Sequence, residues 1–178
     1  LTTVFDQFKF KASYGLTGQD QIGDGNDRFY YLSQVTLNSS DRNVNWGTQL
    51  NYNPGGIIVD RYANDEIGWE KSYKLNVGAE MRTVFGLSAN VEYFTERLEN
   101  ILLNRIIPNT MGIIPYVKAN LGKAKGKGVD MELNYEKSFN KDLWITGRGT
   151  FTYATSEAVE WEEPDYSETP WLSKVGKS

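Results

Sequence analysis

The sequence predicts an all-β protein: an antiparallel up-and-down segment of a transmembrane β-barrel, with about five long strands and long extracellular loops. Five segments alternate apolar and polar residues, as strands do when their two faces meet different surroundings. These segments run for about 9 to 17 residues, whereas strands of soluble proteins usually have about five or six. Short and long connections alternate along the chain, which places the tight turns at one end of the sheet and the long loops at the other.

In chain order, the five expected strands cover residues 8–16, 69–82, 86–102, 128–136 and 142–154. Two short turns join the second strand to the third and the fourth to the fifth, whereas about fifty and about twenty-five residues form the two longer connections. All five prolines lie outside these segments, as the interior of a sheet requires. Smaller alternating pieces within the long connections predict strand extensions or hairpins at 29–37, 43–52 and 56–62.

The parity of the alternation predicts one shared apolar face. The side chains expected on it include Tyr73, Leu75, Val77, Ala79 and Met81 together with Leu87, Val91, Val129, Met131, Leu133 and Ile145. A slip of one residue in any strand would turn its apolar side chains to the opposite face. Without a second layer or a neighbouring molecule, this face would be an exposed apolar sheet.

Aromatic residues lie near both ends of the expected apolar band. Tyr14, Tyr73, Tyr93 and Tyr153 fall toward the long-loop end, whereas Phe85, Tyr135 and Phe139 fall toward the short-turn end. Two such girdles are typical of a barrel wall that faces lipid. The alternative is that tyrosine, which has a high strand propensity, caps the core of a soluble sheet.

Composition excludes several classes of function. The 178 residues include neither Cys nor His, which removes thiol nucleophiles, disulfides, Cys/His zinc sites and histidine triads. The net charge of -4 disfavours a nucleic-acid partner. No apolar run approaches the roughly 20 residues of a spanning helix. The opening residues lack the features of a signal peptide, so the chain is expected to be either cytosolic or an internal piece of a longer protein.

No catalytic, cofactor or metal site is expected. The adjacent carboxylates Glu162 and Glu163 lie in the acidic stretch 157–168, which we interpret as a solvated loop and not as an acid–base pair. Calcium binding there has only weak support, because the stretch lacks the spaced D-x-D-x-D-G pattern.

Two further groups are candidates for contacts. Lys123, Lys125 and Lys127 share one face near the loop end, and they either meet anionic lipid head groups or form a solvated rim of charge. Five loop aromatics could stack on sugar rings, meet a partner protein or anchor the long loops to one another: Trp46, Tyr52, Tyr62, Trp161 and Trp171.

Three separated stretches of the chain resemble motifs of one protein family, and they follow one another in the same order as in that family. KFKASYGLTGQDQIGD (9–24), IGWEKSYKLNVGAEM (67–81) and NTMGIIPYVKANLGKAKGKGVDMELNY (109–135) resemble motifs in the C-terminal barrel region of the SusC/RagA family of TonB-linked outer-membrane transporters from Bacteroidetes. The chain departs from the family pattern at Gly126, where asparagine is usual, and at Asp130, where glutamate is usual.

The resemblance implies an outer-membrane barrel of about 22 strands with a lumen filled by an N-terminal plug. It also implies a SusD-like surface lipoprotein that lids the barrel, a glycan or peptide substrate, and energy from the TonB complex acting on the plug. Residues 1–178 would then be part of the barrel domain, with the plug, signal peptide and remaining strands outside this chain. The alternatives are a siderophore-type receptor and a soluble β-sandwich that binds carbohydrate.

Overall fold

The computed structural model describes residues 4–20, 29–112 and 117–177. Its elements in chain order, with η marking a short 3-10 helix, are β1 (Phe5–Gln19), β2 (Gln34–Ser39), η2 (Ser40–Arg42), β3 (Gly56–Arg61), β4 (Glu70–Thr83), β5 (Leu87–Asn104), η3 (Asn109–Met111), β6 (Lys118–Ser138), β7 (Trp144–Glu160) and η4 (Pro170–Leu172). Among the described residues, no helix is long and apolar enough to span a membrane.

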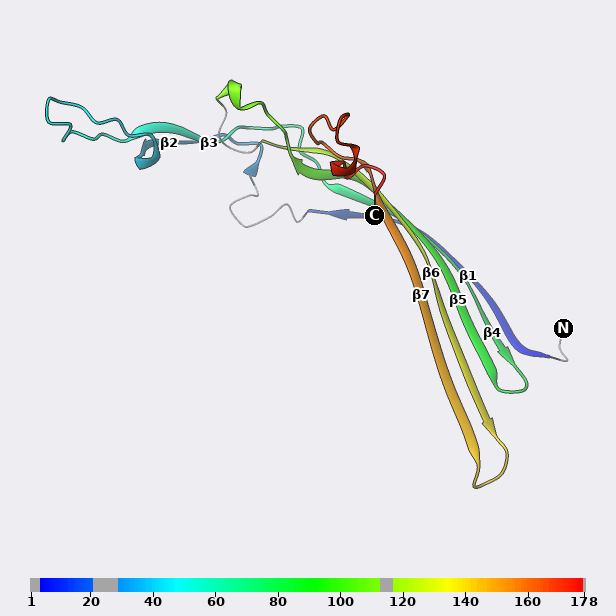
Figure 1. Cartoon of the computed structure of the whole chain (residues 1–178). Helices are drawn as coiled ribbons and strands as arrows, with labels where there is room; N and C mark the ends of the chain where they lie inside the picture. The colour runs from blue at the N-terminus through cyan, green and yellow to red at the C-terminus, as the bar shows by residue number, and fades with distance from the viewer. Residues whose placement is uncertain (1–3, 21–28, 113–116, 178) are drawn as a thin grey trace.

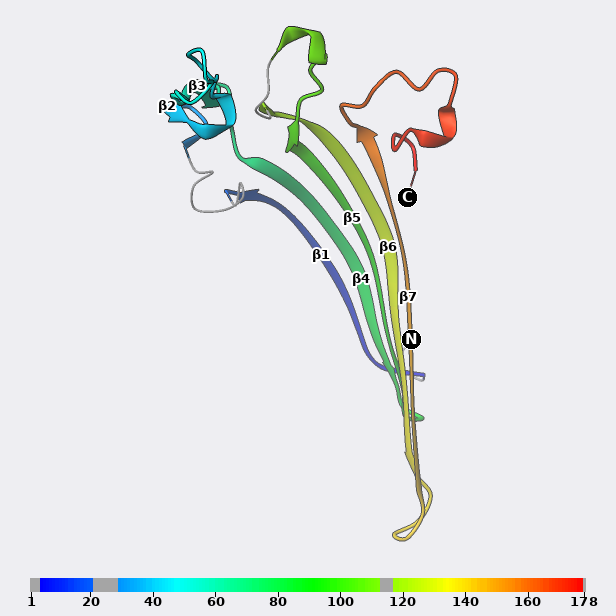
Figure 2. The same ribbon diagram turned by 60° about the vertical axis from the view of Figure 1, so that its left-hand side comes forward.

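Five strands form one curved sheet in the order β1-β4-β5-β6-β7, and every neighbouring pair is antiparallel (Figures 1 and 2). The tight turns after β4 and β6 lie at one end of the sheet, and the longer connections lie at the other (Figure 2). The remaining two strands, β2 and β3, pair only with each other and form an arm that projects from the long-loop end (Figure 1). The predicted antiparallel all-β fold is therefore confirmed, as an open segment and not a closed barrel.

The register confirms the predicted faces. One row across the sheet joins Phe10, Ala79, Val91, Met131 and Phe151 as direct cross-strand partners. Directly opposed residues project to the same side of a sheet, so all five side chains share the apolar face. The row beside it carries Lys11, Gly78, Glu92, Asp130 and Thr152, which therefore define the polar face.

The sheet is a single layer and has almost no core. Of the hydrophobic residues that the structure describes, only Tyr30 and Ala89 are buried. On the apolar face the rings of Phe10 and Tyr153 are 66% and 60% exposed. Exposed apolar surface of this extent marks a contact with lipid or with another protein surface.

Two predicted strands were too short at the long-loop end. The fourth predicted strand, 128–136, is β6 and begins ten residues earlier at Lys118. The fifth, 142–154, is β7 and continues to Glu160. Lysines in the extension of β6 face glutamates in the extension of β7, so the hydrophobic alternation ends although the backbone pairing continues. The connection before β6 is consequently shorter than predicted, and the arm strands are shorter than the predicted pieces 29–37 and 56–62.

Close approach of neighbouring atoms requires glycine at Gly86 and at Gly128. Gly86, in the turn between β4 and β5, has a φ of 93°, and its carbonyl accepts a hydrogen bond from the Glu136 backbone amide at 2.9 Å. At Gly128 a Cβ atom would lie 2.4 Å from the Phe94 ring and 2.6 Å from the Tyr153 carbonyl oxygen. A side chain at either position would force the neighbouring strand away.

Asn120 fastens the start of β4 to β5 and β6 above the apolar band. Its side-chain amide donates to the carbonyls of Gly68 and Asn100 at 2.9 and 2.7 Å, and its oxygen accepts from the Gly68 amide at 2.8 Å. The neighbouring Glu70 carboxylate accepts from the Leu102 amide at 3.1 Å. Asn120 and Gly68 belong to two of the sequence stretches that carry the family resemblance, and the fold brings them together.

We predict that Asn120→Ala destabilises the folded protein by about 1–3 kcal/mol, because it leaves partly buried backbone groups without partners. Hydrogen exchange measured on the detergent-solubilised protein should show loss of protection at the Gly68 amide. Asn76→Ala is the matched control, since Asn76 lies on the polar face of β4, and it should leave that amide protected. Equal protection at Gly68 in Asn120→Ala and wild type would contradict this role.

Candidate functional site

Cross-strand ion pairs organise the polar face. Glu80 on β4 accepts from Lys11 on the neighbouring strand, with Lys9 Nζ 3.8 Å away. Glu96 lies 3.3 Å from Lys74 Nζ. Toward the other edge, Arg148 lies 3.0 Å from a Glu132 oxygen. Opposite charges therefore pair across three of the four strand contacts, whereas Glu92 on β5 lies directly opposite Asp130 on β6. The result is a hydrophilic wall.

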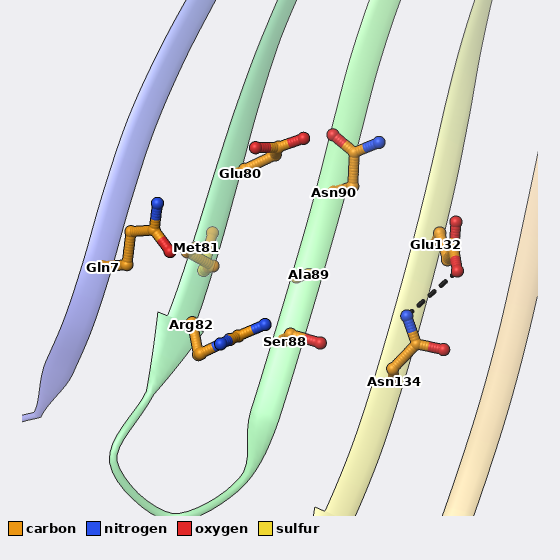
Figure 3. A pocket seen from close by; sticks show the side chains of 9 residues that line it. All are labelled: Gln7, Glu80, Met81, Arg82, Ser88, Ala89, Asn90, Glu132 and Asn134. Atoms are coloured by element: carbon orange, nitrogen blue, oxygen red, sulfur yellow. Dashed lines mark hydrogen bonds between the residues drawn. The ribbon is translucent and has the colours of Figure 1, made fainter.

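A shallow depression of about 290 Å³ lies on this face near the short turns (Figure 3). Two rows of cross-strand partners supply its polar lining: Glu80, Asn90 and Glu132 in one row, and Arg82, Ser88 and Asn134 in the next. The side-chain amide of Asn134 donates to Glu132 at 3.0 Å, as the dashed line marks.

The chemistry that this depression offers is hydrogen bonding with both signs of charge. It lacks a nucleophile–base pair, and no group of three or more acidic side chains that could hold a metal ion occurs in the described part of the chain. Such a wall suits contact with water, with a polar solute or with a polar protein surface.

Trp46 and Tyr52 lie together at the far end of the arm. Their backbones exchange two hydrogen bonds, at 2.7 and 3.2 Å, around a turn in which Gly47 has a φ of 90°. Residues paired in this way project their side chains to the same side. The two side chains are 58% and 65% exposed, so they form an accessible aromatic pair.

The other three predicted contact residues lie elsewhere. Tyr62 follows β3 and is 39% exposed. Trp161 follows β7 and is partly covered by Lys174, whose Nζ lies 5.6 Å from the ring centroid. Trp171 lies in η4 and is 71% exposed. The structure thus groups the five aromatics as one pair and three separate positions, and it does not gather them into a single site.

The predicted basic run lies within β6, on the apolar face and toward the long-loop end. Lys123 pairs with Glu160 at 2.8 Å, and Lys125 pairs with Glu157 at 2.5 Å. The third lysine, Lys127, is exposed and lies directly opposite Thr155.

The acidic stretch 157–168 is not the uniformly solvated loop that the sequence predicts. Its first four residues belong to β7, and Glu157 and Glu160 there bind lysines. Glu162 lies 3.7 Å from Arg105 Nε. Glu163 accepts from the Lys174 amide at 2.9 Å and from the Ser173 hydroxyl. The adjacent carboxylates thus hold separate partners.

Sequence reasoning missed the residue that anchors the arm. Tyr30 is 6% exposed, and the Lys118 and Arg61 side chains lie over its ring, at 4.9 and 5.8 Å from the centroid. The Tyr30 carbonyl accepts from the Asn64 amide at 2.8 Å, and the Asn64 side chain donates to the Lys118 carbonyl at 2.8 Å. These partners come from distant segments without a periodic pattern, so the sequence carries no signal for them.

A single-layer sheet with one apolar face and one ion-paired polar face defines a segment of a membrane barrel wall. Comparison with known proteins gives the family. Residues 1–174 match the family described as "TonB dependent receptor-like, beta-barrel", and the chain belongs to it.

Relatives with assigned names agree with this family. The chain is 28% identical over 141 residues to TonB-dependent receptor P3 of Formosa agariphila, covering 78% of this chain and 13% of that protein. It is 21% identical over 159 residues to TonB-dependent receptor SusC of Bacteroides thetaiotaomicron, covering 89% of this chain and 14% of that protein. The chain therefore spans only a small part of the length of these relatives.

A solved structure with the same fold is that of the RagAB peptide importer in its closed-closed state. The match has a TM-score of 0.68 and 24% identity, and it covers 89% of this chain and 16% of that one. The structure of the RagAB peptide transporter gives a TM-score of 0.67 at the same identity and coverage. The predicted relationship to SusC- and RagA-like TonB-dependent barrels is confirmed.

We predict that the C-terminal segment loosens in acid. The Lys174 amide, followed by the Ser173 hydroxyl, lowers the pKa of Glu163 below its ordinary value of 4.5. Because the folded-state pKa is depressed, the stabilisation is complete above pH 4.5 and is lost as the pH falls through the folded value. Hydrogen-exchange protection factors for residues 173–175 should therefore drop below about pH 4.5.

Glu163→Gln should remove this pH dependence, since the amide carries no titrating charge. Glu168→Gln is the control, because Glu168 is an exposed carboxylate of the same segment. A pH profile that is identical in Glu163→Gln and wild type would show that another group holds the segment.

Proposed function

We propose that this chain forms part of the wall and extracellular loops of an outer-membrane TonB-dependent transporter. In this account the transporter imports glycan or peptide oligomers together with a SusD-like surface lipoprotein. The observation that carries the proposal is the division of one sheet into an apolar face and an ion-paired polar face, in a chain of this receptor family.

The height of the apolar band supports a membrane position. On β4 it runs from Tyr73 to Met81, and on β7 it runs from Ile145 to Tyr153, which is nine residues in each strand. A tilted strand crosses the hydrocarbon layer in roughly 9–11 residues. The long-loop end of the sheet would then face the cell exterior.

We propose that residues 1–178 are one part of the barrel domain of a longer protein. The small coverage of the relatives, 13% and 14%, supports this division. A plug, a signal peptide and the remaining strands would lie elsewhere in that protein, and the TonB complex would act through the plug.

The loop aromatics are our candidates for contact with the substrate or the lid lipoprotein. Trp46 and Tyr52 are the strongest, because they form an exposed pair on the projecting arm. Trp171 and Tyr62 are also accessible, whereas the contact of Trp161 with Lys174 favours the anchoring of a loop. Aromatic rings of this kind stack on sugars and pack against protein surfaces.

Peptide or glycan import is preferred to siderophore uptake because the named neighbours include SusC and the RagAB peptide importer. A soluble sandwich would need a second sheet over the apolar face. The described strands of the main sheet form one layer, so this alternative has no support from the fold.

Deletion of the parent gene should abolish growth of its host on one class of oligomer and leave growth on the corresponding monomers intact. Loss of the TonB complex should give the same phenotype. A defect only under iron limitation would favour the siderophore receptor. Normal growth on every oligomer tested, with normal iron uptake, would contradict a transport role.

Complementation tests the aromatic pair. The double variant Trp46→Ala/Tyr52→Ala should lower oligomer uptake by at least roughly fivefold, since each of the two lost aromatic contacts costs about 0.5–1.5 kcal/mol. Leu37→Ala is the matched control, because Leu37 is another exposed apolar residue of the arm. Uptake that falls equally in both variants would assign the effect to the arm as a whole.

A further inference from the structure

The upper border of the apolar face changes from apolar to polar, with one lysine, across β5, β6 and β7. One row joins Tyr93, Val129 and Tyr153 as direct partners. The next row toward the long loops on the same face joins Thr95, Lys127 and Thr155. Two residues of a strand span about 7 Å. In the proposed membrane position, this step corresponds to the passage from lipid acyl chains to lipid head groups.

A depression of about 290 Å³ lies at this border. Its lining consists of Thr95, Lys125, Gly126, Lys127, Thr155, Ser156 and Glu157. All of these except Gly126 and Ser156 occupy apolar-face positions, so the hollow opens toward the surroundings of the barrel and not toward its lumen.

Of the two lysines in this depression, Lys125 is ion-paired, and Lys127 can bind an external anion. The Glu157 carboxylate is held by Lys125 at 2.5 Å. Thr95 donates its hydroxyl proton to the Gly126 carbonyl at 3.2 Å, which leaves the oxygen free to accept. Within the described part of the chain, no carboxylate lies within 4 Å of the Lys127 ammonium, and this side chain is exposed.

An aromatic hollow adjoins the basic one. This second depression, of about 440 Å³, shares Thr95 and is lined by Tyr14, Tyr73 and Leu75 as well as by the ion-paired Arg97 and Glu99. A free inorganic anion would gain no binding energy from this adjoining aromatic depression. A lipid with a phosphorylated sugar head group would use both hollows, because the phosphate requires a cation and the sugar and upper acyl chains pack on aromatic rings.

We propose that the border of the apolar face binds an outer-leaflet glycolipid through its phosphate, with Lys127 as the main cationic contact. Lys125 and the Thr155 hydroxyl provide further hydrogen-bond donors at the same hollow. This inference rests on the proposed membrane position of the chain. It adds a lipid-recognition site on the outside of the wall that is separate from the polar face.

The test uses the full-length protein in phosphatidylcholine nanodiscs that contain either phosphorylated lipid A or the same lipid after removal of its phosphates. Lipid retained by the protein after detergent extraction is counted by native mass spectrometry. The wild type should retain the phosphorylated form roughly fivefold more strongly than the dephosphorylated form. An excess of inorganic phosphate should not displace it.

Lys127→Gln should abolish this preference, and Lys127→Arg should keep it. Lys9→Gln is the matched control, because Lys9 is an exposed lysine on the polar face, and it should behave as wild type. A preference that survives in Lys127→Gln would overturn the proposal, as would displacement by inorganic phosphate.

The two hypotheses fail in different ways. A protein that inserts into nanodiscs and transports its oligomer, but shows no preference for the phosphorylated lipid, contradicts only the lipid site. A protein that does not insert into a bilayer contradicts the proposed function itself.

Discussion

Unbroken backbone pairing with a strict two-residue period is the constraint on which the rest of this structure depends. In a bilayer, every amide and carbonyl of a crossing strand must find a partner in a neighbouring strand. The register between β4 and β5 has no shift over its whole length. In the five-stranded sheet the register shifts lie near Phe5, near Leu98 and at Lys123, all outside the apolar band. Within the band, the unshifted register therefore determines for every side chain whether it lies on the apolar or the polar face.

Above the band the same strands serve another purpose. The backbone pairing of β5 and β6 continues, but the apolar-face positions of β6 carry Lys123 and Lys125. Irregular backbone becomes possible here, as the φ of 59° at Asn100 illustrates. The Asn100 carbonyl is then used by Asn120, which ties the entry into β4 to the sheet. Hydrogen bonds and ion pairs thus stabilise the loop end of the sheet. The apolar band, in contrast, depends on lipid or another protein surface to cover it.

The parts of the fold that obey a period could be predicted from the sequence. The alternation from Tyr73 to Met81 determines the face of β4, and the tight turn after β4 determines that β5 is its neighbour. The start of β6 at Lys118 could not be predicted in this way, because lysine and glycine replace the apolar residues there. The packing of Lys118 over Tyr30 depends on where the arm folds back, and no local pattern encodes that contact. The five candidate aromatics were found by residue type alone, which explains why they lie in several places.

The two functional hypotheses concern different faces of the sheet. Transport concerns the polar face and the loops beyond it, whereas lipid recognition concerns the border of the apolar face. Both depend on the same assignment of odd and even positions on β5, where Val91 lies on one face and Asn90 on the other. A wrong parity would exchange the two roles.

The most direct test is a cysteine scan along β5 in a bilayer, which this chain permits because it contains no cysteine. Single cysteines at Ala89, Asn90, Val91, Glu92 and Tyr93 would be labelled, and each would be tested against a water-soluble maleimide and a quencher attached to lipid acyl chains. The account predicts quenching by lipid at 89, 91 and 93 and reaction from water at 90 and 92. Uniform behaviour along the strand, or the opposite alternation, would contradict it.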